Sequence, residues 1–116
     1  MIEINNLSYT ENNKKIIDNI KLNITKNKTA IIGENGSGKS TLIRLLLGFK
    51  SYKGSIKIFG KEVKSNTKYI RSQISLVNQN PEYQIVFPTI IEELTFCKEL
   101  DIKKINHTLN QINLNK

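Results

Sequence analysis

A glycine-rich loop that leads directly into an apolar helix constrains the fold of this chain more than any other feature. Residues 33–41 read GENGSGKST and match the pattern G-x-x-x-x-G-K-[ST]. The loop follows residues 29–32, a short continuous apolar run that predicts a buried strand. It precedes residues 41–47, which are apolar on nearly every side and are followed by Gly48, so they predict a buried helix with a glycine cap. A strand, a phosphate-binding loop and a helix in this order predict a P-loop α/β fold.

The backbone of this loop suits phosphate binding. Successive N–H groups can curl around an anion only where the chain adopts conformations that a Cβ would forbid, and Gly33, Gly36 and Gly38 are expected to supply that freedom. The helix that begins near Gly38 should point its unpaired N–H groups and its positive dipole end at the same anion. Three other loop residues are expected to contribute mainly through their backbone: Glu34, Asn35 and Ser37.

Three side chains at the end of the loop predict contacts with a nucleotide. Lys39 carries a positive charge on a flexible stem and should reach the β- and γ-phosphates. Ser40 is placed to bind Mg²⁺ through its hydroxyl, and Thr41 can donate to the α-phosphate. These residues predict ATP and Mg²⁺ as ligands.

The remaining patterns favour a mixed α/β architecture. Residues 2–4 and 16–24 predict strands of a half-buried antiparallel sheet, separated by a turn at residues 11–13. Residues 54–60 alternate with period two between glycines and predict another strand, and residues 74–77 predict one more. Pro81 removes a ladder donor, so a loop is expected there. A stripe of apolar residues predicts an amphipathic helix near the end: Ile102, Ile105, Leu109 and Ile112.

Composition narrows the class of protein. With 116 residues and 38% hydrophobic content, we expect one small globular domain without a spanning helix or secretory signal, and therefore a cytoplasmic protein. Cys97, the single cysteine, is expected to be a buried, inert thiol. The net charge of +8 comes from scattered lysines that do not alternate with aromatic residues. This pattern does not favour a specific nucleic-acid role.

The segments around the loop resemble the ATP-binding domain of ABC transporters, from Ile2 to about Phe96. The resemblance rests on Asn6-Leu7-Ser8-Tyr9, on the loop form GENGSGKSTL, on residues 54–60, and on Leu76-Val77-Asn78-Gln79-Asn80-Pro81. It implies that Tyr9 stacks on adenine. It also implies that Gln79 is the Q-loop glutamine, which approaches Mg²⁺ and the attacking water and lies in the loop facing the membrane subunit. Lys39 and Gln79 are then the expected catalytic residues.

Residues 79–84, followed by Phe87-Pro88-Thr89 and Glu92-Glu93, resemble the energy-coupling-factor and cobalt-type importers within this family. The family's LSGGQ signature, acidic Walker B strand and H-loop histidine do not occur in the 116 residues. We therefore expect residues 1–116 to be the N-terminal part of an ABC ATPase domain, with an antiparallel β subdomain and an incomplete core. As a truncated product or fragment, the chain is expected to be inactive alone, with unpaired apolar strand edges that are inclined to associate.

Two features resemble catalytic residues without matching them. Ile90-Ile91-Glu92-Glu93 resembles an apolar strand ending in acids, but Pro88 interrupts the run and the acids suit the first turn of a helix. His107 falls within the last helical pattern and is expected to be a solvated helix residue.

The leading hypothesis is a truncated ATP-binding subunit of an ABC importer, located at the cytoplasmic face of the membrane. Its expected partners are a transmembrane subunit, contacted through the Q-loop region, and a second ATPase subunit. One alternative is a non-catalytic nucleotide-binding remnant. Another is a different P-loop enzyme such as a small-molecule kinase, which should show more arginines for a second phosphate acceptor than Arg44 and Arg71.

Overall fold

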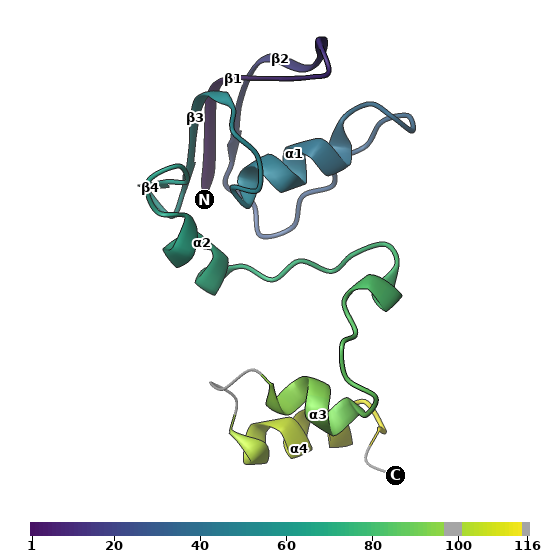
Figure 1. Cartoon of the computed structure of the whole chain (residues 1–116). Coiled ribbons are helices and arrows are strands. Elements are labelled where there is room, and N and C mark those ends of the chain that lie inside the picture. The colour runs from purple at the N-terminus through teal and green to yellow at the C-terminus, as the bar shows by residue number, and fades with distance from the viewer. Residues whose placement is uncertain (97–100, 115–116) are drawn as a thin grey trace. The chain divides into compact units, whose positions relative to one another are not determined.

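The computed structural model describes residues 1–96 and 101–114, which form two compact units, Met1–Ser75 and Leu76–Lys116. Figure 1 shows their elements. The first unit contains β1 (Ile2–Glu11), β2 (Lys14–Ile24), α1 (Lys39–Leu46), β3 (Lys53–Ile58), β4 (Lys61–Glu62) and α2 (Thr67–Gln73). The second contains a 3₁₀ turn (Pro81–Tyr83), α3 (Ile90–Thr95) and α4 (Ile102–Gln111). Cys97, predicted to be buried, lies outside the described residues.

The sheet of the first unit is antiparallel throughout, with strand order β2-β1-β3-β4. Its central strand, β1, pairs on both sides, so Ile4 lies opposite Leu22 on β2 and Ile56 on β3. Asn12 and Asn13 form the turn between β1 and β2 with φ values of 49° and 61°. Asparagine tolerates this left-handed conformation, which tight hairpins require, so the predicted turn is confirmed.

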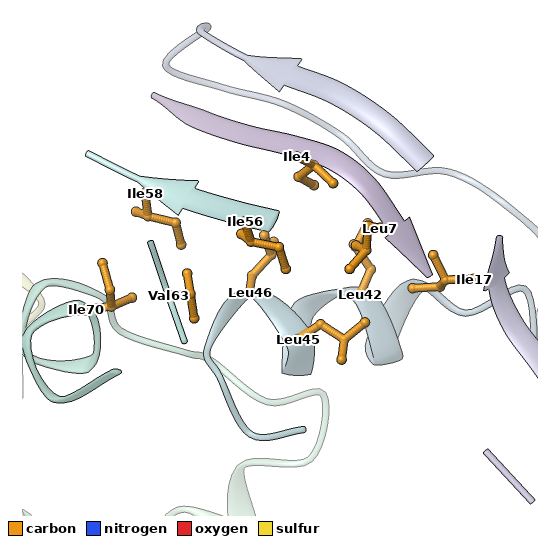
Figure 2. Close-up of a cluster of buried hydrophobic side chains, with 10 residues drawn as sticks. All are labelled: Ile4, Leu7, Ile17, Leu42, Leu45, Leu46, Ile56, Ile58, Val63 and Ile70. Atoms are coloured by element: carbon orange, nitrogen blue, oxygen red, sulfur yellow. The ribbon is translucent and has the colours of Figure 1, made fainter. Parts of the chain in front are cut away.

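One hydrophobic core joins this sheet to the two helices of the first unit (Figure 2). Leu42, Leu45 and Leu46 of α1 are buried in the same cluster as Ile4 and Leu7 of β1. The other members come from β2, β3, the segment after β4, and α2: Ile17, Ile56, Ile58, Val63 and Ile70. Burying a side chain of this size contributes about 1.5–3 kcal/mol, so the core holds α1 firmly against the sheet. The predicted apolar helix after the loop is confirmed, as are the strands predicted near the N-terminus and at residues 54–60.

Two predicted strands are wrong. Residues 29–32 and 74–77 form no strand, and Ile32 and Val77 are 92% and 88% exposed. A strand is stable only when neighbouring strands satisfy its backbone groups. Among the described residues, the four paired strands are β1 to β4, and none of them extends beside either segment.

The second unit is built from short helical segments. Thr89 accepts a hydrogen bond from the Glu92 amide and caps α3, whose first turn holds Glu92 and Glu93, so the prediction for this acidic pair is confirmed. In α4, Ile105 and Leu109 are buried and His107 is exposed, as predicted. Ile102 and Ile112, at the ends of the predicted stripe, are 61% and 56% exposed. Across the described ranges, every helix is too short or too polar to cross a lipid bilayer.

Candidate phosphate-binding site

Two glycines of the glycine-rich loop adopt a left-handed backbone that other residues rarely adopt. Gly36 and Gly38 have φ values of 84° and 93°, and Gly38 is the N-cap of α1. A side chain would be strained at both positions, which confirms the freedom predicted for these two glycines. Gly33 does not share the positive φ of these two glycines. A Cβ there would lie 2.8 Å from the Ser37 hydroxyl oxygen, a contact that rotation of the serine side chain would relieve.

Lys39 places its positive charge inside this loop. Its ammonium group donates to the carbonyl oxygens of Gly33 and Glu34, each at 2.7 Å. The Ser37 amide also donates to the Glu34 carbonyl at 3.2 Å and closes a turn. The lysine charge is therefore held among backbone groups of the loop, where it would meet an anion entering the cradle.

The first turn of α1 adds further positive character. The Leu42 amide donates to the Gly38 carbonyl at 2.8 Å, which makes this the first α-helical hydrogen bond. The amides of Lys39, Ser40 and Thr41 precede it, and such amides have no partner within a helix. No acidic residue stands in this turn, so nothing there opposes the positive end of the helix dipole. Ser40 is exposed and Thr41 is half-buried.

Both ends of α1 are fixed to the rest of the first unit. At its start, a Cβ on Gly38 would lie 3.3 Å from the Ile16 side chain of β2, so the loop packs closely against this strand. At its end, the Arg71 guanidinium of α2 donates to the carbonyls of Leu47 and Gly48 at 3.0 and 2.9 Å. Arg71 thus caps a helix, which weakens the kinase alternative that needed it for a second phosphate acceptor.

Tyr9 lies on β1 opposite Ile17 of β2. The preceding residue on β2, Ile16, packs against Gly38. Its half-buried ring packs against the core, and its hydroxyl donates to a Glu11 carboxylate oxygen at 3.0 Å. The Lys50 ammonium forms an ion pair with the same oxygen and lies 5.3 Å from the centre of the Tyr9 ring. Sequence reasoning missed Glu11 and Lys50, because neither belongs to a motif.

Charge is retained on both members of this ion pair. The hydrogen bond from Lys50, followed by that from Tyr9, lowers the pKa of Glu11 below its ordinary value. The hydrogen bond to Glu11 raises the pKa of Lys50. Each partner favours the charged form of the other, so the pair persists at neutral pH.

Gln79 lies in the second unit, whereas the phosphate loop and Tyr9 lie in the first. Its side chain is exposed. The Gln84 amide group fixes the chain just before it, since its oxygen accepts from the Asn78 amide at 2.8 Å and its nitrogen donates to the Leu76 carbonyl at 2.7 Å. Gln79 is therefore an accessible side chain that follows a segment held by two hydrogen bonds from Gln84.

Comparison with known proteins relates this geometry to a family. The family model described as ABC transporter matches residues 17–116. An energy-coupling factor transporter ATP-binding protein, EcfA1, of Fusobacterium nucleatum is 44% identical over 104 residues, which cover 85% of this chain and 39% of the relative. The EcfA1 of Ligilactobacillus salivarius is 46% identical over 104 residues, covering 85% of this chain and 37% of the relative.

A solved structure shares the fold. It is cbiO1 from Clostridium perfringens, described as part of the ABC transporter complex cbiONQ, with a TM-score of 0.77 and 24% identity over 95% of this chain and 47% of that one. The chain spans less than half the length of these relatives. The family model covers most of the sequence and includes the whole phosphate loop, and the similar relatives are named as transporter ATP-binding proteins. The chain therefore belongs to the ABC transporter family.

Proposed function

We propose that this chain supplies the phosphate-binding part of an ABC transport ATPase subunit, in which residues 33–41 hold the phosphates of ATP. The observation that carries the proposal is the position of Lys39. Its ammonium lies within hydrogen-bonding distance of two loop carbonyls, directly before a helix whose first amides have no helical partner. A cation and free amides that converge on a glycine loop suit a polyphosphate.

The proposal extends to the base and the metal. Tyr9 would contact the adenine ring and the Ser40 hydroxyl would bind Mg²⁺. For a role of Gln79 at the metal, the support is its match to the Q-loop glutamine of the family. In the part of the chain that the structure describes, no three His, Cys, Asp or Glu side chains gather into a metal site. Donors such as a hydroxyl oxygen and an amide oxygen fit Mg²⁺, which is usually held by a few protein oxygens together with nucleotide phosphates and water.

At the level of the whole protein, the subunit would couple ATP binding and hydrolysis to import. It would stand at the cytoplasmic face of a membrane, contact a transmembrane subunit through the region around Gln79, and act with a second ATPase subunit. Support comes from the relatives, which are named as ATP-binding proteins of energy-coupling factor transporters. Lys39 and Gln79 would take part in hydrolysis. The 116 residues alone would bind ATP without turning it over, because the signature, the acidic strand and the H-loop histidine of the family are not among them.

Calorimetric titration of the chain with ATP and Mg²⁺ tests the proposal. Lys39→Ala should weaken ATP binding by at least about tenfold, because a hydrogen bond to a charged group is worth about 1.5–3 kcal/mol. Lys21→Ala removes the same charge from an exposed site on β2 and should leave the affinity unchanged. Equal losses in both variants would indicate non-specific attraction to a basic chain. Phosphate release above background that Lys39→Ala abolishes would disprove inactivity.

A further inference from the structure

The cluster of Tyr9, Glu11 and Lys50 has no assigned role in the site. Its members come from the last part of β1 and from the loop between α1 and β3. The side chains of Lys50 and Glu11 are 27% and 41% exposed, against 57% and 64% for Lys15 and Asp18, the other ion pair among the described residues. The Glu11–Lys50 pair is thus the more sheltered one, and an aromatic ring belongs to it.

The cluster restricts the movement of the Tyr9 ring. One carboxylate oxygen of Glu11 accepts from the Tyr9 hydroxyl and also pairs with Lys50. The Lys50 ammonium lies near the ring itself, at 5.3 Å from its centre, where the ring quadrupole attracts a cation. Glu11 therefore holds the hydroxyl group of Tyr9, and Lys50 contacts its ring. A ring held in this way loses little freedom when a flat ligand stacks on it.

The cluster also joins two parts of the first unit. Lys50 follows the C-terminal end of α1, the end away from the phosphate loop, and Tyr9 lies opposite Ile17 on the strand against which Gly38 packs. A positive charge on Arg44 of α1 acts on Glu11 as well, in the direction that keeps the carboxylate charged. Within the cluster, Tyr9 is therefore the member that lies on the strand pair against which the start of α1 packs.

We infer that Glu11 and Lys50 are positioning residues that orient Tyr9 for contact with the base of the nucleotide. The inference rests on the proposed function. Its consequence is selective: the ion pair strengthens binding of a ligand that has a base and leaves binding of a bare polyphosphate unchanged. A purely structural tie between β1 and the loop after α1 would affect both ligands alike.

The test compares ATP with inorganic tripolyphosphate, each with Mg²⁺, on the full chain. The double variant Glu11→Gln/Lys50→Met removes the pair at constant net charge. We expect it to weaken ATP binding by about two- to fivefold, the range of a partly exposed ion pair, with tripolyphosphate affinity unchanged. Lys50→Arg keeps a cation beside both the carboxylate and the ring, so it should retain most of the wild-type ATP affinity. Lys15→Met/Asp18→Asn, matched in charge, should change neither affinity.

Each other result overturns the inference in a recognisable way. If the double variant binds ATP as the wild type does, the pair positions nothing. If it loses affinity for both ligands equally, the cluster is a structural tie. If the wild-type chain binds tripolyphosphate and ATP with the same affinity, the base makes no contact, and the phosphate loop retains its function without Tyr9. If the wild-type chain binds neither ligand, the proposed function itself fails, and the inference fails with it.

Discussion

Strand β1 and residues 29–32 both contain isoleucines that predicted a strand, but they have opposite structures. Ile4 is completely buried, whereas Ile32 is 92% exposed. Ile4 lies on β1, which pairs with β2 and β3, and it is buried in the same core as the leucines of α1. Residues 29–32 have no regular structure. An apolar run allows a segment to form a strand, but the strand forms only where it pairs with other strands.

This difference shows how the phosphate loop is held. The loop joins an unpaired segment on one side to α1 on the other. Its organising contacts come from the side of the helix: Gly38 packs on Ile16, Leu42 begins the helical hydrogen bonds, and Lys39 reaches back to the Gly33 carbonyl. The predicted strand before the loop is therefore not what shapes the cradle in this chain. Order in the loop depends on α1 and on the sheet that buries it.

The largest effect should come from shortening the same side chain in the two regions. Ile4→Ala removes a fully buried side chain and should lower the free energy of unfolding by about 2–5 kcal/mol, through lost transfer energy and the cavity that remains. Ile32→Ala should change it by less than about 0.5 kcal/mol, as expected for an exposed position. Urea titration followed by circular dichroism measures both. Comparable losses would mean that residues 29–32 are buried in solution.

Local patterns predicted the elements whose partners are near in sequence. The turn at Asn12 and Asn13, the strands that it joins, and the helix closed by Gly48 follow from residue types within a few positions. The strands at 29–32 and 74–77 could not be judged in this way, because a strand depends on neighbours that the run itself does not reveal. Helix α2 was missed because only Ile70 within it is buried, which gives no apolar stripe.

The candidate site likewise contains residues that the sequence predicted and residues that it did not. The loop residues form a contiguous motif, so their types predicted the positive φ of Gly36 and Gly38. The contacts of Lys39 with the Gly33 and Glu34 carbonyls were not predicted, because a phosphate was the expected partner of its ammonium group. Glu11 and Lys50 are separated by 39 positions and meet only because the core brings α1 under β1. Charged residues in turns and loops usually indicate solvent, so nothing in the sequence marked them as a pair.

A smaller effect should appear in association between chains. Ile32→Lys places a charge where an apolar side chain is 92% exposed, so it should reduce concentration-dependent self-association while leaving unfolding unchanged. Thr29→Lys adds the same charge to the same exposed segment and keeps the isoleucine. Sedimentation at several concentrations measures the difference. If both variants reduce association equally, net charge rather than apolar contact controls it.

The smallest effect concerns the polar contacts that close β1 onto the loop after α1. Because Lys50, and then Tyr9, lower the pKa of Glu11 below its ordinary value of 4.5, the folded state holds the charged carboxylate better than the unfolded state does. This stabilisation is present above the ordinary pKa and is lost as the pH falls through the lowered one. Glu11→Gln should therefore lower the urea midpoint slightly at pH 7, and its difference from the wild type should shrink as the pH falls below 4.5 and vanish once the carboxyl group is protonated in the folded state. Lys50→Met should behave in the same way, because it removes the partner. A difference that does not shrink with falling pH would show that Glu11 stabilises β1 by packing rather than by charge.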